Sequence, residues 1–275
     1  IDRRRAVGKL VELQDKLVFQ PLKGKVGIGH TRWATHGEPN EKNAHPHNSG
    51  AVSVVHNGII ENFLELRHEL SCDGYKPETD TDTETIAMLC SKFIDEGHEP
   101  IVAAQKTLSK LSGSFAIAML FAGHENLMIA ARSGSPLAVG YGKNEMYLGS
   151  DALALLPMTK KITYLEEGDL AILTREGVDI YDHLGNFVSR PIKYLDQSAN
   201  FYDKSGFNHF MEKEIYEQPV ALEKAIKSYI CDENVGAKIN LLKELNFKEI
   251  PKIILIACGT AYYACYVAKY WIEKL

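Results

Sequence analysis

The chain has 275 residues, of which 45% are hydrophobic and 24% are charged, and its formal net charge is −5. This composition is typical of a globular protein in solution that exceeds one ordinary domain, so we expect one large domain and part of another. Acidic and basic residues are interspersed, with no basic run longer than Arg3–Arg5, so no nucleic-acid-binding face is predicted.

The predicted elements between Val26 and Tyr194 are mostly short strands. Each is an apolar run of strand length, and turn sequences rich in Gly, Asn and Asp separate several of them. The expected strands are Val26–Ile28, Ala51–Val55, Phe115–Phe121, Leu127–Ala131, Leu137–Tyr141, Met146–Leu148, Leu170–Thr174 and Val178–Tyr181. Helical periodicity predicts helices at Ile59–Leu70, Thr83–Ile94 and Ile101–Leu111. Because the helices are grouped rather than alternating with strands, the pattern favours a layered α+β fold over a doubly wound sheet.

The polar segment Asp196–Phe207 lacks any sustained period and predicts a linker between domains at 1–195 and 208–275. Beyond it the sequence predicts three helices, a buried strand, and a further helix over about 261–275. The three helices are Met211–Ile215, Val220–Ile230 and Val235–Leu245, and the strand is Ile253–Ala257. A strand, a Gly turn and a helix open an α/β domain, but one strand is too few for a sheet, so we expect this second domain to be truncated.

Targeting and redox signals are few. The five cysteines form no C-x-x-C pair, which predicts neither a disulfide framework nor a zinc knuckle; they are Cys72, Cys90, Cys231, Cys258 and Cys265. No apolar run approaches the roughly 18 residues that span a bilayer, and no signal peptide follows Ile1. We therefore expect a cytoplasmic protein that does not bind membranes. Since the chain does not begin with Met, we also expect it to be processed or part of a longer protein.

Two loops of the first domain carry groups suited to holding an amino acid. The planar guanidinium of Arg32 can bind a carboxylate bidentately, and Asp82, at an expected helix start, could receive an ammonium group. Each has a simpler interpretation, because Thr81 or Asp82 could be the helix N-cap and Arg32 could form a surface salt bridge.

Asn57-Gly58 is expected between an apolar strand and a helix, where a side-chain amide and a backbone N–H could form an oxyanion hole; an ordinary Asn-Gly turn is the alternative. Five histidines fall between His30 and His56, but without an H-E-x-x-H motif or a Cys pair we expect no metal site. No G-x-S-x-G or Walker motif is present, and no cofactor is predicted.

Taken together, the motifs closely resemble the glutamine:fructose-6-phosphate amidotransferases, a family within the class II amidotransferases, over essentially the whole chain. The motifs are Gly29-His-Thr-Arg-Trp-Ala-Thr-His-Gly37, Asn43-Ala-His-Pro-His47, His56-Asn-Gly-Ile-Ile-Glu-Asn62, Thr81-Asp-Thr-Glu84, Ala131-Arg-Ser-Gly-Ser-Pro136, Leu165-Glu-Glu-Gly-Asp169 and Glu212-Lys-Glu-Ile-Tyr-Glu-Gln-Pro219. The resemblance implies an N-terminal-nucleophile αββα four-layer sandwich followed by the start of an α/β sugar-isomerase domain.

The resemblance also implies an activity: glutamine is hydrolysed, ammonia is channelled, and fructose 6-phosphate is aminated and isomerised to glucosamine 6-phosphate. Carried over to this sequence, Arg32 would hold the glutamine carboxylate and Asp82 its ammonium, with Asn57 and Gly58 as the oxyanion hole. The resemblance also implies that Trp33, Thr35 and His36 bind glutamine, that Trp33 is the ammonia gate, and that Thr31–Asn40 is the closing loop with Gly37 as its hinge. Cys258, Gly259 and Thr260 would contact the sugar phosphate, although Ala261 stands where the family commonly has Ser.

One departure concerns the nucleophile, which in the family is an N-terminal Cys acting with its own α-amino group. Position 1 here is Ile1, so we expect the nucleophile and first strands to precede it, and we predict that the 275-residue chain does not hydrolyse glutamine. The implied partners are L-glutamine, fructose 6-phosphate and a second copy of the chain, bound through the isomerase domain. A glutamine or sugar-phosphate sensor without a nucleophile, or another class II amidotransferase, is the alternative.

Overall fold

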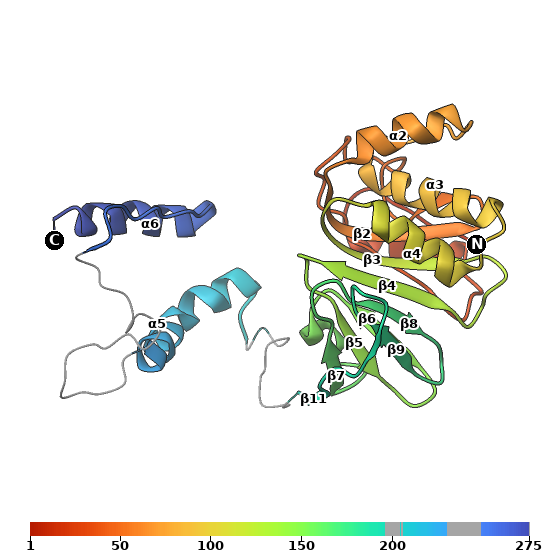
Figure 1. Cartoon of the computed structure of the whole chain (residues 1–275). Helices are drawn as coiled ribbons and strands as arrows, with labels where there is room; N and C mark the ends of the chain where they lie inside the picture. The colour runs from red at the N-terminus through yellow and green to blue at the C-terminus, as the bar shows by residue number, and fades with distance from the viewer. Residues whose placement is uncertain (196–203, 205, 230–248, 275) are drawn as a thin grey trace. The chain divides into compact units, whose positions relative to one another are not determined.

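The computed structural model of the protein describes residues 1–195, 204, 206–229 and 249–274. The chain forms two compact units, Ile1–Gln197 and Ser198–Leu275, and each is described by itself (Figure 1). Among these residues, no helix combines the length and the apolar character needed to cross a membrane.

A seven-stranded antiparallel sheet forms the centre of the first unit, in the order β1-β2-β3-β4-β8-β9-β10. Its strands are β1 (His47–Ser49), β2 (Val52–Ile60), β3 (Gly113–Phe121), β4 (Met128–Ser133), β8 (Leu170–Leu173), β9 (Val178–Tyr181) and β10 (Phe187–Val188). β2 and β3 pair without interruption from Val52↔Phe121 to Ile60↔Gly113. This long pairing supports the strand on which the candidate site is built.

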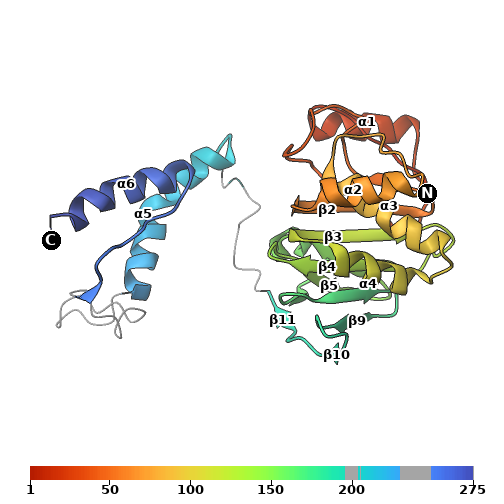
Figure 2. The same ribbon diagram turned by 45° about the horizontal axis from the view of Figure 1, so that its top comes forward.

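Three helices cover one face of this sheet, as Figure 2 shows: α2 (Phe63–Cys72), α3 (Asp82–Asp95) and α4 (Pro100–Lys110). α3 contacts β1, β2, α2 and α4, so its sides are enclosed and its residues 82–91 are all buried. Ile86 and Leu89 of α3 pack in one cluster with Val54 of β2 and Ile117 of β3. Burying this apolar surface fixes the start of α3 against β2.

A second antiparallel sheet, ordered β11-β7-β5-β6, forms the next layer. Its strands are β5 (Ala138–Tyr141), β6 (Met146–Gly149), β7 (Lys161–Tyr164) and β11 (Lys193–Tyr194). A cluster containing Ala116 and Ala130 from the first sheet and Val139 from the second fills the space between them. On the outer face of the second sheet lies the short 3₁₀ helix η1 (Ala152–Leu155).

The layered α+β prediction is confirmed by these antiparallel sheets and their helical cover. The four-layer sandwich is seen only in part, because the described residues supply one helical layer, two sheets and the single turn of η1. Strand Val26–Ile28 was predicted wrongly, since no strand forms there. Four short strands, β1, β7, β10 and β11, were missed because two to four residues carry almost no periodic signal.

The largest correction concerns β2, which continues through Asn57 and Gly58 to Ile60, whereas the sequence predicted a strand end at Val55 and a helix from Ile59. Non-local pairing overrides the local turn signal here, since Asn57 lies opposite Ala116 and Gly58 opposite Phe115. Helix α2 therefore begins only at Phe63.

The first unit also contains helix α1 (Leu10–Phe19). Two helices of the second unit are described. α5 (Phe210–Tyr229) runs through Pro219, so the predicted break between two shorter helices was wrong. α6 (Gly259–Ile272) confirms the predicted last helix, but Ile253–Ala257 forms no strand. The predicted helix Val235–Leu245 and most of the predicted linker lie outside the described residues.

Candidate functional site

A cavity of about 250 Å³ brings the predicted glutamine-site residues of the first unit together. Its lining comes from the loop over residues 30–45, from β2 and from the start of α3. All seven predicted residues are there: Arg32, Trp33, Thr35, His36, Asn57, Gly58 and Asp82. The pairing of β2 with β3 and the packing of α3 on β2 unite groups that lie far apart in sequence.

Asp82 supplies the cavity with a buried carboxylate that is only 3% exposed. Its Oδ2 accepts a hydrogen bond from the backbone N of Ile60 (3.0 Å) and lies 3.9 Å from His56 Nδ1. Burial lowers the pKa of His56 to about 4, although Asp82 opposes this effect, so the imidazole is neutral at pH 7 and forms no ion pair with Asp82. The carboxylate thus lacks a full counter-charge from this neighbour, which suits it to receive an ammonium group.

The alternative interpretation, in which Thr81 or Asp82 serves only as the helix N-cap, is supported in part. Thr81 occupies the N-cap position of α3, but its side chain makes no capping hydrogen bond. The Thr81 hydroxyl is instead 3.1 Å from His47 Nε2. Asp82 is the first residue of the helix, where a negative charge is stabilised by the helix dipole and by nearby N–H groups.

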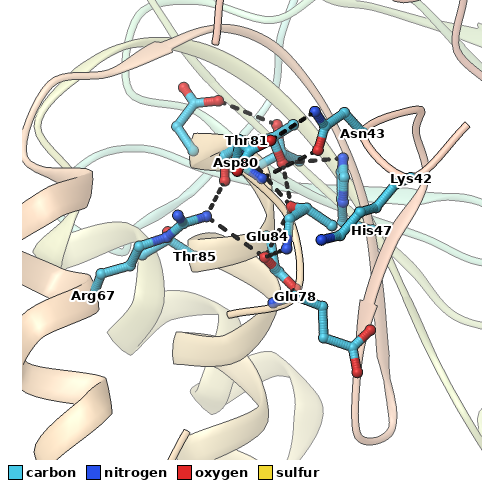
Figure 3. A network of polar contacts seen from close by, with 12 residues as sticks. Lys42, Asn43, His47, Arg67, Glu78, Asp80, Thr81, Glu84 and Thr85 are labelled. Carbon is cyan, nitrogen blue, oxygen red and sulfur yellow. Dashed lines mark hydrogen bonds and ion pairs between the residues drawn. The ribbon is translucent and has the colours of Figure 1, made fainter. Parts of the chain in front are cut away.

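The turn that precedes α3 is held by a polar network, shown in Figure 3. Glu84 accepts hydrogen bonds from the backbone N atoms of Glu78 (2.9 Å) and Thr79 (2.8 Å), and Arg67 lies 3.5 Å from it. Asn43 bonds Asp80 twice, from Nδ2 to a carboxylate oxygen (3.1 Å) and from the Asp80 backbone N to Oδ1 (3.1 Å). The network ties the loop that contains Arg32 to the turn that leads into Asp82 and α3.

Arg32 stands on the rim of the cavity and organises its own loop. Its guanidinium donates to the backbone carbonyls of Glu38 (2.9 Å), Gly37 (3.0 Å) and His36. Burial lowers the pKa of Arg32 and the Asp82 carboxylate raises it, so the two charges interact across the cavity. In the part of the chain that the structure describes, Arg32 forms no salt bridge, which leaves the remaining N–H groups of its fork for a ligand carboxylate.

Two residues of this loop bear on its predicted closure. Gly37 has a φ of 76°, and a Cβ there would lie 2.7 Å from Asn43 Nδ2, so only glycine fits without a shift. The Trp33 side chain is 90% exposed, although it lines the cavity. The hinge role of Gly37 and the gating role of Trp33 stay predictions.

Asn57 and Gly58 lie side by side at the cavity wall within β2. The Asn57 Oδ1 is 2.7 Å from His30 Nε2, so its oxygen is engaged and its NH₂ group is left to face other partners. Gly58 has a φ of 115°, and a Cβ there would lie 2.0 Å from the Ser114 carbonyl oxygen. The arrangement suits an oxyanion hole, which stays a prediction.

From the sequence, the histidines were considered only as metal ligands, and their contacts with one another were not predicted. His30 stacks on His45 with ring centroids 4.2 Å apart, and His45 meets His47 edge to face at 4.9 Å. Burial lowers the pKa of His45 to about 2 and that of His47 to about 3, so both rings are neutral at pH 7. Across the described ranges, no group of three or more His, Cys, Asp or Glu side chains is arranged to hold a metal.

Among the described residues, none of the cysteines lines the cavity. Cys72 and Cys90 belong to α2 and α3, and burial raises the pKa of Cys90 to about 11, which makes it a poor nucleophile. Cys258 stands at the N-cap of α6 in the second unit, and Gly259, with a φ of 61°, and Thr260 follow it.

Comparison with known proteins identifies similar chains. Residues 30–157 match a family model described as a glutamine amidotransferase domain. The whole chain is 50% identical over 275 residues to glutamine–fructose-6-phosphate aminotransferase (isomerizing) of Brucella suis biovar 1 (strain 1330), and 51% identical over 277 residues to its namesake from Gluconobacter oxydans (strain 621H). Each match covers 100% of this chain and 45% of the relative, so the chain spans about half the length of these curated relatives.

A solved structure also matches, that of glutamine phosphoribosylpyrophosphate amidotransferase from B. subtilis. The match has 26% sequence identity and a TM-score of 0.48, and it covers 57% of this chain and 35% of that one.

Proposed function

We propose that the first unit binds L-glutamine as a nitrogen donor, because residues 30–157 match a glutamine amidotransferase domain and the chain is 50% identical to a glutamine–fructose-6-phosphate aminotransferase. The observation that supports the proposal is that one cavity is lined by the Arg32 guanidinium, the buried Asp82 carboxylate and the Asn57-Gly58 pair. These three features match the three polar ends of glutamine: its carboxylate, its ammonium and its side-chain carboxamide.

In the proposed complex, Arg32 binds the α-carboxylate and Asp82 the α-ammonium of glutamine. Asp82 is held by the Ile60 N–H, and α3 is packed on the sheet, so its carboxylate is in place before the ligand arrives. The carboxamide then extends toward β2. Thr35, His36 and Trp33 enclose the remaining surface of the ligand.

The Asn57 NH₂ group and the Gly58 N–H stabilise the oxyanion that forms when a nucleophile attacks the carboxamide carbon. Such donors act most strongly on the charged tetrahedral intermediate, because negative charge develops on the oxygen as the nucleophile adds to the carboxamide carbon and the C=O π bond opens. The C=O bond forms again when the C–N bond breaks and the nitrogen leaves as ammonia. The departing ammonia leaves past Trp33. The attacking group is a thiolate in this proposal, as the resemblance to the N-terminal-nucleophile amidotransferases implies.

The acceptor and the assembly follow from the relatives' names and the sequence resemblance. We infer that ammonia reaches fructose 6-phosphate, that Cys258, Gly259 and Thr260 contact the sugar phosphate, and that two copies of the protein associate through the isomerase domain. The location is the cytoplasm. The overall product is glucosamine 6-phosphate.

Calorimetric titration of the 275-residue chain with L-glutamine tests the central part of the proposal. Asp82→Asn should weaken glutamine binding about 10- to 100-fold, the equivalent of one charge-assisted hydrogen bond. Binding of glutaramate, which is glutamine without its α-amino group, should change little. Asp179→Asn, an exposed aspartate of β9, is the matched control. Equal glutamine affinities for the wild type and Asp82→Asn would refute the assignment of the ammonium site.

A further inference from the structure

We propose that His30 is a positioning residue that holds the Asn57 side chain with its NH₂ group facing the glutamine carboxamide. The inference rests on the proposed function and adds a residue to it. The resemblance assigned no role to His30. The structure places it in the cavity wall, in contact with one of the two oxyanion donors.

The contact between His30 and Asn57 determines which atom carries the proton. A carboxamide oxygen only accepts hydrogen bonds, so at 2.7 Å from Asn57 Oδ1 the His30 Nε2 must carry the proton. That bond fixes which end of the amide points toward His30. Because the backbone of Asn57 is locked opposite Ala116 in the β2–β3 ladder, only side-chain rotation could reorient the group. A half-turn of the amide would put its oxygen where the oxyanion forms and would repel it.

The His30 ring is itself supported by a neighbouring histidine ring. It stacks on His45, with centroids 4.2 Å apart and planes 23° from parallel. The His45 Nε2 is 3.0 Å from the Thr83 hydroxyl, and Thr83 is only 1% exposed in the first turn of α3. The orientation of Asn57 is therefore tied through two stacked rings to the turn that carries Asp82. The ammonium and oxyanion ends of the site share one support.

His30 acts by positioning Asn57 and not as a general base or nucleophile. A general base or nucleophile needs an accessible lone pair, but His30 Nε2 is engaged with Asn57 and its Nδ1 is buried. Burial also lowers the pKa of His30, which favours the neutral ring. His30 can thus orient Asn57, whereas neither of its ring nitrogens offers an accessible lone pair to a substrate.

Nuclear magnetic resonance of the ¹⁵N-labelled chain tests the hydrogen bond without any ligand. At pH 7 His30 should show a protonated Nε2 and an unprotonated Nδ1. His30→Ala should shift the Asn57 side-chain amide signals, which are assigned by their loss in Asn57→Asp. His30→Gln, whose amide can donate in place of Nε2, should return them toward the wild-type position. His68→Ala, an exposed histidine of α2, should leave them unchanged. Unchanged Asn57 signals in His30→Ala would overturn the proposal.

Binding measurements test the consequence for the site. The γ-sulfonamide analogue of glutamine is tetrahedral at the reacting centre, whereas glutamine is planar there. His30→Ala should weaken the analogue about tenfold and glutamine less than about threefold, and His30→Gln should restore the difference. Equal weakening of both ligands, with no rescue by His30→Gln, would mean that His30 only supports the cavity and would overturn the proposal. If the wild type binds neither ligand, the proposed function fails, while the resonance experiment still decides the role of His30.

Discussion

At the scale of single residues, Gly58 shows how one position of β2 meets two demands. Its backbone N–H is a proposed oxyanion donor, and its α-carbon lies so close to β3 that an added Cβ would be 2.0 Å from the Ser114 carbonyl oxygen. The positive φ of 115° adds strain for any other residue. The Asn-Gly pair was identified from the sequence, but the close approach of β3, which makes glycine necessary, was not visible there.

Gly58→Ala is expected to destabilise the first unit by about 3 kcal/mol, the combined effect of backbone strain and overpacking. Urea unfolding followed by circular dichroism measures the loss. Gly177→Ala is the control, because a Cβ there meets no atom within 4 Å and its φ is not positive. If Gly58→Ala unfolds at the same urea concentration as the wild type, the close approach of β3 is wrong.

At the scale of elements, the sequence predicted what local periodicity encodes. The helix at α3 was predicted within a residue at each end, because apolar residues recur at helical spacing along it. The extension of β2 was not predicted, because its pairing with β3 depends on residues more than fifty positions away. The sequence prediction therefore placed Asn57 and Gly58 in a turn, whereas the structure places them within β2. Their partnership with Asp82 was still implied by the family resemblance, which carries information that periodicity lacks.

The buried histidines that join the loop, β2 and α3 should make the first unit sensitive to acid. Burial lowers the folded-state pKa of His47 to about 3 and that of His56 to about 4, whereas both titrate near 6.5 when unfolded. Between pH 6.5 and about 4 the unfolded chain therefore binds more protons than the folded one, so stability is lost as pH falls. Each such histidine contributes about 1.4 kcal/mol per pH unit to the slope.

His47→Gln should therefore make the stability of the first unit less dependent on pH between 6.5 and 4.5. Urea unfolding at several pH values in this range gives the slope. His124→Gln changes an exposed histidine and is the control. A slope as steep in His47→Gln as in the wild type would contradict the buried, neutral state of this ring.

At the scale of the whole molecule, the first unit brings the proposed glutamine-binding residues together in one cavity, and no cysteine among the described residues lines it. We expect the 275-residue chain to bind glutamine without hydrolysing it. Release of ammonia from glutamine, measured with a coupled dehydrogenase assay, should equal the rate without protein. Sustained turnover, lost in Asn57→Ala, would show that another group of this chain attacks.

The architecture could be predicted in its class but not in its connections. Short apolar runs and grouped helices indicated a layered α+β fold, while the strand order and the position of η1 depend on contacts between distant segments. The choice of site residues came from motif resemblance, and the cavity shows that the seven residues of the first unit can meet. The contacts of His30 with Asn57 and His45 had no signal in the sequence beyond the clustering of histidines.

A crystal structure of the chain with L-glutamine tests the central claim most directly. The account predicts one glutamine in the cavity between the loop, β2 and α3. Its carboxylate should lie on Arg32, its ammonium on Asp82, and its carboxamide oxygen within hydrogen-bond distance of Asn57 Nδ2 and the Gly58 N–H. Glutamine bound elsewhere, or with its ammonium turned toward Asn57, would contradict it.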